Sequence, residues 1–430
     1  MPMKFAIHTL GCKVNQYESQ ALEQLLRENG HETCDAGEIC DGYIVNTCSV
    51  TAVSDKKCRA VIRRIKRQAP QAVIGVCGCY AQVAPDAIRE LEVDVISGTG
   101  GRQEFLKLFL QAAEERQHLE ALDDALRRKL PFEVLPAGSL AERTRAMLKV
   151  QDGCQNFCSY CIIPYARGPI RSLPLEQAVE QTKQLAEQGY REIVITGIEI
   201  SSWGRDLGGR PLHELIAAVC EAAPALRIRL GSLEPRTIDE AFCAALKGYE
   251  NLCPQFHLSL QSGSDGVLKR MNRRYDTARY AESVRLLREA FPGCAITTDL
   301  IVGFPGETEE EFRETLEFIE KMAFSQMHIF PYSRRPGTPA DQMPNQIPGP
   351  VKDERAAKAA EVAEAMSLAY RTAMKDSVVP VLFEQPERGA FAGHTANYVK
   401  VYVPMAPLHN ELREVRIGEV YLDGVRGTLV

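Results

Sequence analysis

Short apolar runs alternate with amphipathic stretches along the first 115 residues of the chain. Strands are predicted at residues 4–10, 43–45, 72–76 and 93–96. Helices are predicted between them, at residues 16–28, 54–68 and 85–91, where apolar positions recur with the helical period. This strand–helix order is typical of a mostly parallel sheet with helices on both faces.

A second alternating series fills residues 145–333. Its predicted strands lie at residues 147–150, 192–196, 227–230, 256–260, 295–302 and 326–330. Its predicted helices lie at residues 175–188, 212–222, 238–246, 278–289 and 309–322. Six strand–helix units in this length fit a partial (β/α)6 barrel better than a complete eightfold one. In such barrels, functional groups lie on the loops that follow the strands.

The remaining segments differ in pattern. Residues 116–139 are charged and then rich in turn formers, which predicts a linker, with a solvated helix over residues 117–129. After a helix predicted at residues 353–374, short strands separated by glycine turns predict a small closed β-barrel. The predicted domains are therefore an N-terminal α/β domain (1–115), the linker (116–139), a barrel domain (140–375) and an all-β domain (376–430).

Charge and cysteine content narrow the function. The 430 residues carry a net charge of −6, so any contact with nucleic acid needs local basic patches. No apolar run reaches the length of a membrane span, and the N-terminus lacks a signal-peptide layout. We therefore expect a cytoplasmic protein without membrane contact. In that reducing compartment, fourteen cysteines favour metal or redox chemistry over disulfides.

Three of these cysteines form the motif CxxxCxxC directly after the strand predicted at residues 147–150. They are Cys154, Cys158 and Cys161. Three thiolates are one short of the four that usually hold a 4Fe–4S cluster, and the open iron of such a cluster can bind a small molecule. The alternatives are a zinc knuckle or three unused thiols. Zinc sites prefer paired CxxC units with four ligands, and no second pair or histidine partner follows here.

A second set of cysteines follows predicted strands of the N-terminal domain: Cys12, Cys48, and either Cys77 or Cys79. The carboxyl ends of parallel strands meet at one edge of a sheet, so these thiols can meet in space and hold a second cluster. The alternative is that they are core cysteines. Gly78 before Cys79 parallels Gly11 before Cys12 and favours Cys79 over Cys77. The other eight are predicted to be small buried hydrophobes: Cys34, Cys40, Cys58, Cys77, Cys220, Cys243, Cys253 and Cys294.

Glycine-containing loops end several of the predicted barrel strands. Each loop alone is a weak signal, but on one barrel face they predict a cofactor pocket above the first cluster, because glycine lets a ligand approach the backbone. The candidate pocket residues are Thr196, Gly197, Glu199, Ser232, Gln261, Ser262 and Gly303.

Taken in order, these motifs resemble the methylthiotransferase family of radical S-adenosylmethionine (SAM) enzymes. The resemblance rests on residues 9–18, 46–48, 78–82, 154–161, 261–264, 299–307 and 330–338, and so spans nearly the whole chain. Residues 13–18 and the C-terminal tail resemble the branch that acts on threonylcarbamoyladenosine beside the anticodon of tRNA. Residues 196–199 depart from the Gly-Gly-Glu that many radical SAM enzymes have there.

The resemblance implies two 4Fe–4S clusters and SAM as cofactors. Cys154, Cys158 and Cys161 would hold the cluster that cleaves SAM, and Cys12, Cys48 and Cys79 the auxiliary cluster that supplies sulfur, which selects Cys79 over Cys77. The resulting 5′-deoxyadenosyl radical would abstract hydrogen from carbon 2 of adenine, where a methylthio group is then added. An external electron donor and a sulfur source are also implied.

The tail resembles TRAM, an RNA-binding barrel. Its cations are Lys400, Arg413, Arg416 and Arg426, and its aromatic residues Phe391, Tyr398 and Tyr402 are either base-stacking platforms or core residues. The densest basic patch is a helix with seven cations in residues 56–67. The named candidates for RNA contact are Lys56, Lys57, Arg63, Arg64, Arg67, Arg334 and Lys400, with residues 269–274 and Arg335 as further ones.

Three alternatives stay open at this point. The same chemistry can act on isopentenyladenosine in tRNA or on an aspartate of a ribosomal protein. The basic patches favour tRNA over the protein. A different class would be an iron–sulfur protein that binds RNA without catalysis.

Overall fold

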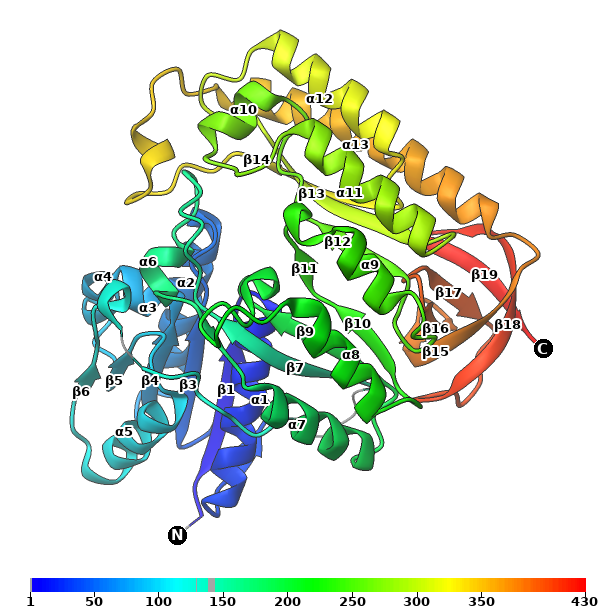
Figure 1. The fold of residues 1–430 in the computed structure, drawn as a ribbon. Coiled ribbons are helices and arrows are strands. Elements are labelled where there is room, and N and C mark those ends of the chain that lie inside the picture. The colour runs from blue at the N-terminus through cyan, green and yellow to red at the C-terminus, as the bar shows by residue number, and fades with distance from the viewer. Residues whose placement is uncertain (1, 129, 138–143) are drawn as a thin grey trace.

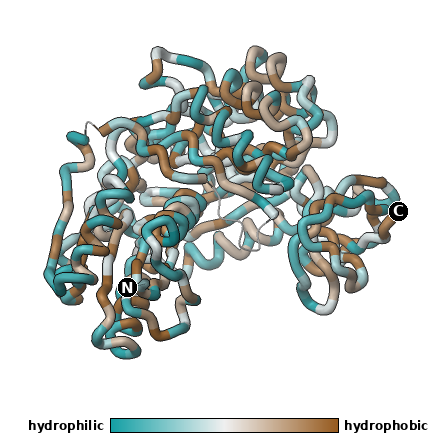
Figure 2. The backbone as a smooth tube through the Cα atoms, turned by 90° about the horizontal axis from the view of Figure 1, so that it is seen from below, coloured by the Kyte–Doolittle hydropathy of each residue, from teal (hydrophilic) through white to brown (hydrophobic). Residues whose placement is uncertain are grey.

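The computed structural model describes residues 2–128, 130–137 and 144–430, and arranges them as three units in chain order (Figure 1). An N-terminal α/β unit lies on one side, a partial barrel of parallel strands lies in the middle, and a small β-barrel lies on the other side. Figure 2 shows the same arrangement from below, with the C-terminus in the small barrel.

The N-terminal unit is a six-stranded parallel sheet of order β2-β1-β3-β4-β5-β6. Its strands are β1 (Lys4–Thr9), β2 (Glu32–Cys34), β3 (Gly42–Thr47), β4 (Val73–Gly78), β5 (Val95–Ser97) and β6 (Leu119–Ala121). Its helices are α1 (Lys13–Glu28), α2 (Ala52–Gln68), α3 (Cys79–Val83), α4 (Pro85–Arg89) and α5 (Arg102–Glu115). Separate apolar clusters cover its two faces, one including Ile62 of α2 and the other Phe105 of α5. The prediction of a parallel α/β sheet is confirmed.

Two expectations for this unit were wrong. The segment 117–129 is not a helix: residues 119–121 form β6 beside β5, and Ala125–Arg127 form a short 3-10 turn (η1), while Lys129 lies outside the described residues. The charged residues beside this strand are typical of a solvated helix. Backbone pairing with β5 nevertheless outweighs the local helix propensity. In addition, Cys34 and Cys40 are joined by a disulfide and are not free buried thiols.

The central unit is a partial barrel made of two four-stranded sheets, β10-β9-β7-β8 and β11-β12-β13-β14. Its strands are β7 (Arg145–Asp152), β8 (Arg171–Ser172), β9 (Glu192–Gly197), β10 (Arg227–Leu230), β11 (Ser232–Leu233), β12 (Gln255–Leu258), β13 (Ala295–Val302) and β14 (Gln326–Pro331). β7, β9, β10, β12, β13 and β14 follow the predicted strands, and only β8 pairs antiparallel within these sheets. The prediction of a partial (β/α)6 barrel is confirmed.

The helices of this unit are α6 (Ile163–Arg167), α7 (Leu175–Glu187), α8 (Leu212–Ala222), α9 (Glu240–Leu246), α10 (Asp265–Arg270), α11 (Thr277–Ala290), α12 (Glu309–Met322) and α13 (Gly349–Ala373). Most of them cover the outside of the barrel, whereas α6 packs against α3 of the N-terminal unit. Ile193 and Ile195 of β9, which alternate with the inward positions, belong to the apolar core against these helices. α13 runs beside α12 and β14 toward the last unit (Figure 1).

The inside of the partial barrel is polar. Register places Arg145, Glu192 and Arg227 in one row across three strands, at the end where the strands begin. Two residues further along each strand, the next row on the same face holds Met147, Val194 and Arg229. Glu192 is fully buried and accepts hydrogen bonds from both Arg227 (2.6 Å) and Arg229 (2.7 Å). Paired charges therefore fill the base of the barrel where most barrels carry aliphatic side chains.

The C-terminal unit is a closed five-stranded barrel, as predicted. Its strands are β15 (Val378–Glu387), β16 (Ala390–Thr395), β17 (Lys400–Val403), β18 (Leu412–Tyr421) and β19 (Gly424–Leu429). The loop between β16 and β17 closes the base of the central barrel. There the Tyr398 ring lies 5.1 Å from the guanidinium of Arg145 and 4.6 Å from that of Arg229.

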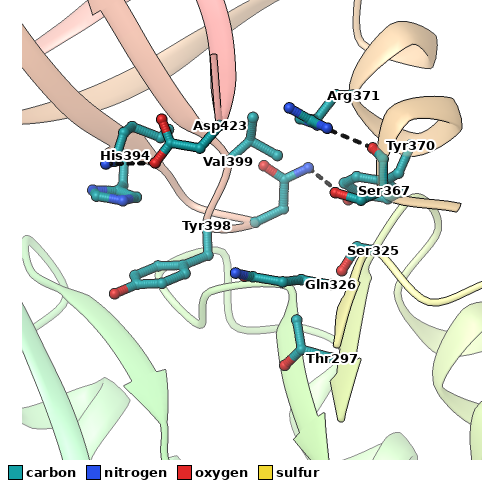
Figure 3. A pocket seen from close by; sticks show the side chains of 12 residues that line it. Thr297, Ser325, Gln326, Ser367, Tyr370, Arg371, His394, Tyr398, Val399 and Asp423 are labelled. Atoms are coloured by element: carbon teal, nitrogen blue, oxygen red, sulfur yellow. Dashed lines mark hydrogen bonds and ion pairs between the residues drawn. The ribbon is translucent and has the colours of Figure 1, made fainter. Parts of the chain in front are cut away.

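Figure 3 shows this junction from close by. Tyr398 extends from the small barrel toward the central strands, and a cavity of about 250 Å³ lies beside it, lined by Thr297, Gln326 and Tyr370 among others. Asn397 donates a hydrogen bond to the Tyr370 hydroxyl of α13 (2.7 Å). The small barrel is therefore anchored by specific polar contacts as well as by the chain connection.

Among the described residues, no helix has the length and apolar character needed to cross a bilayer.

The charged base of the central barrel yields a first prediction. Burial alone would raise the pKa of Glu192, but Arg229 and Arg227 outweigh it and hold the pKa at about 2. A carboxyl group with a depressed pKa stabilises the fold above its unfolded pKa of about 4.3, and this stabilisation is lost as the pH falls toward 2. In Glu192→Gln, two arginines stay buried without their carboxylate. The free energy of unfolding at pH 7 should fall by about 3–5 kcal/mol, measured by urea denaturation.

The pH profile supplies the control for Glu192. The variant should lose less stability than the parent protein between pH 5 and pH 3. Glu187→Gln, an exposed change on α7, should leave both measurements within about 0.5 kcal/mol of the parent protein. Equal effects of the two substitutions would contradict the assigned role of Glu192.

Candidate active site

Three cysteines lie at one edge of the N-terminal sheet. Cys12 caps the N-terminus of α1 after β1, Cys48 follows β3, and Cys79 begins α3 after β4. β1, β3 and β4 are adjacent parallel strands, so their carboxyl ends share one edge. Proximity is direct at Gly11, where an added Cβ would lie 2.7 Å from the Cys48 sulfur. The structure therefore brings together the three thiols that the sequence placed after these strands.

Backbone geometry distinguishes Cys79 from Cys77. Gly78 has φ +98°, and a Cβ there would lie 2.5 Å from the carbonyl oxygen of Thr47, so only glycine fits before Cys79. Cys77 belongs to the apolar cluster on the α5 side of the sheet. Burial raises the pKa of Cys79 to about 11; Arg167 opposes the rise, and the thiols of Cys12 and Cys48 add to it. The geometry favours Cys79 as the third member of this set.

The other three cysteines lie on the loop between β7 and α6. The Cys161 amide donates to the carbonyl of Cys158 (3.0 Å), and the Cys154 amide donates to that of Gly168 (3.0 Å), which shapes the loop into a tight turn. Burial raises the pKa of Cys154 and of Cys161 to about 12 each, and neighbouring Cys158 adds to both shifts. Because iron binds thiolates, occupation of such a site releases protons.

A partly buried arginine, Arg273, faces this loop. Arg273 donates from Nη1 to the Cys158 sulfur at 3.3 Å, and its guanidinium lies 4.8 Å from the ring centre of Tyr275. The sequence had suggested residues 269–274 as an RNA contact. That suggestion is wrong for Arg273, which points inward to a cysteine sulfur, and Arg270 is engaged by Glu311 (2.7 Å).

Neither cysteine set has the arrangement of a single-ion site. Within the described ranges, no three or more histidine, cysteine, aspartate or glutamate side chains are arranged to hold one metal ion. A 4Fe–4S cluster offers a separate iron to each thiolate, so its ligands do not converge on one point. The donor sets are three thiols each, which fit a cluster with one open iron.

A buried charge network joins the two cysteine-bearing units. Glu18 of α1 accepts hydrogen bonds from Arg167 of α6 (2.6 Å), Lys149 of β7 (3.0 Å) and Arg102 of α5 (3.1 Å). Lys149 also donates to Asp152 (2.6 Å). All five side chains are nearly inaccessible to solvent. Burial opposes the charged form of Glu18, but Arg102, Arg167 and Lys149 together hold its pKa well below the usual value.

Arg167 connects this network to the first set of cysteines. Its Nη2 donates to Asn15 at 2.8 Å, and its charge lowers the pKa of Cys79. Its Nε is buried and has no hydrogen-bond partner among the described residues. A buried cationic donor that lacks a partner beside three thiols fits an anionic thiolate cluster at this edge.

Glu199 supplies a second unpartnered group, on the loop after β9. Its amide is held by the side chain of Gln151 (2.8 Å), whereas its Oε1 is buried without a partner within the described residues. Burial raises the pKa of Glu199 to about 7; Arg205 opposes this rise and Glu234 adds to it. A carboxylate in this position fits the ammonium group of SAM.

The other predicted pocket residues have mixed environments. Thr196 and Gly197 end β9 at the same edge as Glu199, and Gln261 adopts a left-handed conformation (φ +69°). Ser232 is exposed and bonded to Ser259 (2.8 Å).

Two further pocket candidates already have internal partners. The Ser262 hydroxyl is buried and accepts a hydrogen bond from the Ser264 amide (3.2 Å). A Cβ at Gly303 would lie 2.4 Å from Lys352, so that residue packs against α13.

Some of the residues predicted to contact RNA are exposed, and others are engaged in ion pairs. Five of them are exposed side chains on α2: Lys56, Lys57, Arg63, Arg64 and Arg67. Arg334 pairs with Asp341 (3.0 Å), and Lys400 pairs with Asp423 (2.9 Å). Arg335 is buried against Asp55 at the start of α2 (2.7 Å), so it joins the two units.

The aromatic residues named as candidates for stacking on RNA bases are buried or already in contact with other side chains. Phe391 and Tyr402 are only 4% and 2% exposed, so the core interpretation is the correct one for both. Tyr398 lies between Arg145 and Arg229 at the junction.

Comparisons with known proteins agree with this geometry. Residues 148–319 match the radical SAM superfamily, and residues 4–98 match "Uncharacterized protein family UPF0004". The chain is 41% identical to "Threonylcarbamoyladenosine tRNA methylthiotransferase MtaB" of Bacillus subtilis, over 92% of this chain and 89% of that protein. The protein of the same name from Thermotoga maritima is 38% identical, over 97% and 95%.

The chain belongs to the radical SAM methylthiotransferase family. The predicted transferase class is thereby confirmed, and the alternative of a non-catalytic protein is excluded. Members of this family use two 4Fe–4S clusters and SAM, as expected. The match extends to "tRNA-2-methylthio-N(6)-dimethylallyladenosine synthase" of Acetivibrio thermocellus, 34% identical over 99% of this chain and 91% of that one.

A solved structure shows the same fold at greater distance. The radical SAM methyltransferase TsrM from Kitasatospora setae superposes with a TM-score of 0.58 at 18% identity, over 79% of this chain and 77% of that one.

Sequence reasoning missed several residues of this methylthiotransferase site. Arg167 and Asp152 carry no motif of their own. The role of Arg167 depends on its contact with Glu18 of α1, and Asp152 takes part through its ion pair with Arg167. Glu18 lies within the 9–18 block, which was the one available signal. Arg273 was noticed as a cation, but its inward direction is set by the fold.

Glu199 yields the second prediction. Because its pKa is about 7, SAM affinity of the reconstituted enzyme should rise between pH 6 and pH 8 as the carboxylate forms. Glu199→Gln should weaken SAM binding about 10-fold or more at pH 8 and remove most of this pH dependence. Anaerobic calorimetry measures both. A variant with unchanged affinity and pH profile would show that Glu199 does not contact SAM; Glu187→Gln serves as control.

Proposed function

We propose that this methylthiotransferase converts threonylcarbamoyladenosine in tRNA to its 2-methylthio derivative. The observation that carries the proposal is the placement of three thiols on each of two domains that a buried charge network holds together. Relatives named for this substrate are 38–41% identical over most of the chain. Residues 4–98 and 148–319, which carry the two cysteine sets, both match family models.

The ligand assignment is part of the proposal. Cys154, Cys158 and Cys161 hold the cluster that binds SAM, and Cys12, Cys48 and Cys79 hold the auxiliary cluster. When bound, these groups supply a 5′-deoxyadenosyl radical and a methylthio group for carbon 2 of adenine. The domain boundaries follow as residues 1–115, 140–375 and 376–430, with the segment between the first two contributing the sixth strand of the N-terminal sheet.

The protein's own side chains orient these groups. Arg273 donates to the Cys158 sulfur and thereby orients that side chain. Arg167 lies near Cys79, and its charge lowers the pKa of that thiol. Glu199 binds the ammonium group of SAM. No residue acts as general base in this scheme, because hydrogen abstraction by a radical replaces deprotonation.

The tRNA approaches over the junction of the N-terminal unit and the central barrel. The exposed cations of α2 face solvent there, and Arg335 of the loop after β14 is bound to Asp55 at the start of the same helix. Phosphates of the anticodon arm neutralise these cations. Lys400 contributes less, because Asp423 and Glu387 already neutralise its charge.

Isopentenyladenosine in tRNA is the second candidate substrate. The observation that favours it is the 34% identity to a dimethylallyladenosine synthase over nearly the whole chain. An external electron donor and a sulfur source complete the proposed reaction, and we place it in the cytoplasm with the tRNA pool.

Cysteine variants test whether one set of cysteines serves SAM cleavage and the other serves methylthio transfer. Cys158→Ala should lower anaerobic release of 5′-deoxyadenosine from SAM at least 100-fold, because one ligand of the SAM-binding cluster is lost. Cys48→Ala should retain that release while abolishing methylthio transfer. Both products are quantified by mass spectrometry. Cys220→Ala, a buried thiol of α8, is the matched control and should retain both activities. SAM cleavage that survives in Cys158→Ala would overturn the assignment.

The substrate is tested with tRNA incubated anaerobically with reconstituted enzyme, SAM, sulfide and a reductant. Nucleoside mass spectrometry should show threonylcarbamoyladenosine gaining a methylthio group. A gain on isopentenyladenosine alone would leave the chemistry intact and replace the substrate. If 5′-deoxyadenosine accumulates while every nucleoside stays unchanged, tRNA is not the substrate.

A further inference from the structure

A cleft of about 840 Å³ lies where the three units meet. α1 contributes Lys13 and Gln16, and the small barrel contributes Tyr398. The inside of the central barrel contributes Arg145 and Arg229. The cleft therefore occupies the lower part of the barrel interior, beside the start of α1.

This cleft leads toward the predicted SAM pocket. Val194 lines the cleft, and Thr196 lies two residues further along β9 on the same face, about 7 Å along the strand. Cys12 directly precedes Lys13. A group bound at Lys13 is therefore close to the auxiliary cysteines, and it lies inside the barrel below the loops that carry the candidate SAM residues.

Charges in the cleft are unequally partnered. Arg145 is paired with Glu384, and Arg229 is paired with Glu192. Lys13 makes no hydrogen bond and no ion pair with the described residues, although its charge interacts at longer range with Tyr398, Arg229, Arg145 and Glu192. Its side chain is exposed to the cleft. The lysine thus stands beside two further cations and lacks an anionic partner of its own.

The proposed substrate carries a matching anion. Threonylcarbamoyladenosine has a carboxylate on the substituent at N6, whereas isopentenyladenosine has only an apolar group there. On the adenine ring, carbon 6 and the reacting carbon 2 both flank N1, so the substituent lies on the same edge as the reaction site. With carbon 2 directed at the auxiliary cysteines, the N6 substituent stays within their neighbourhood, where Lys13 lies.

We propose that Lys13 binds the carboxylate of the threonylcarbamoyl group and is the residue that selects this nucleoside over isopentenyladenosine and unmodified adenosine. This inference rests on the proposed function. Glu384 and Glu192 neutralise Arg145 and Arg229, so Lys13 supplies the positive charge of the cleft that has no ion-pair partner among the described residues. Tyr398 lines the cleft from the small barrel. Removal of one partner from such a charge pair costs at least about 2 kcal/mol, which corresponds to about 30-fold.

The test uses anticodon stem-loop RNAs that differ only at the reactive nucleoside. One carries threonylcarbamoyladenosine, one its carboxylate methyl ester, one isopentenyladenosine and one adenosine. Reconstituted enzyme is compared with Lys13→Met, which keeps length and removes charge, and with Lys13→Arg, which restores it. Lys183→Met, an exposed lysine on α7, is the matched control. Dissociation constants come from fluorescence anisotropy and kcat/KM from mass spectrometry.

Lys13→Met should lose about 30-fold or more in kcat/KM on the carboxylate RNA, and its affinity for that RNA should fall to that for the adenosine RNA. On the methyl ester RNA it should change by no more than about twofold, and Lys13→Arg should recover part of the loss. Iron content and SAM cleavage without RNA should match the parent enzyme, which separates substrate selection from cluster damage.

Three results would overturn the inference. Equal weakening of all four RNAs would make Lys13 a phosphate contact. Weaker SAM binding would make it a ligand of the SAM carboxylate. Equal affinity of the parent enzyme for the carboxylate and adenosine RNAs would show that the enzyme does not select for the carboxylate. Failure of the proposed function appears separately, as a parent enzyme that binds the carboxylate RNA selectively but methylthiolates only isopentenyladenosine.

Discussion

The buried ion network around Glu18 is the interaction on which the rest of the site depends. The two cysteine sets belong to separate domains, so their relative position is set by whatever joins those domains. Glu18 takes charge-assisted hydrogen bonds from Arg102 of its own domain and from Lys149 and Arg167 of the barrel. Because each buried charge needs its partners, sliding one domain against the other would leave ions unpaired at high cost.

The same principle operates at the opposite end of the barrel. Glu192 neutralises Arg227 and Arg229. The two guanidinium groups in turn donate to the carbonyl oxygens of His394, near the end of β16, and of Ala396, in the loop that follows. A partial barrel with a polar interior cannot be closed by aliphatic packing alone. The small barrel supplies this closure, so it has a structural role in addition to any contact with RNA.

Beside these two networks, the lower part of the barrel interior holds an open cleft that Lys13 lines. The 154–161 loop and Glu199 follow the carboxyl ends of β7 and β9, whereas the cleft with Lys13, Arg145 and Arg229 lies nearer the ends where these strands begin. The cofactors carry out the radical and sulfur chemistry. The protein positions them, supplies the surrounding charges and excludes competing nucleosides. Two groups that lack a partner within the part of the chain that the structure describes, Glu199 Oε1 and the Lys13 ammonium, lie where a ligand of opposite charge would pair with them.

The sequence by itself determined most of the architecture. Hydrophobic periodicity located β1, β3, β4 and β5 of the N-terminal sheet, six strands of the central barrel and the closed small barrel, because each of these strands carries its own apolar pattern. It missed the short strands β2, β6, β8 and β11. Cysteine spacing identified the 154–161 loop, because those thiols are neighbours in the chain. The sequence also placed Cys12, Cys48 and Cys79 at one sheet edge through strand order alone.

Only the tertiary structure decided what depends on contacts between distant residues. β6 is a strand because β5 offers it a pairing edge, against the helical appearance of its charged surroundings. Arg273 and Arg335 are cations that any reader of the sequence would place on the surface, yet packing turns one to Cys158 and the other to Asp55. Whether a charged side chain faces solvent or a buried partner is fixed by the opposing element, and the local sequence carries no record of that element.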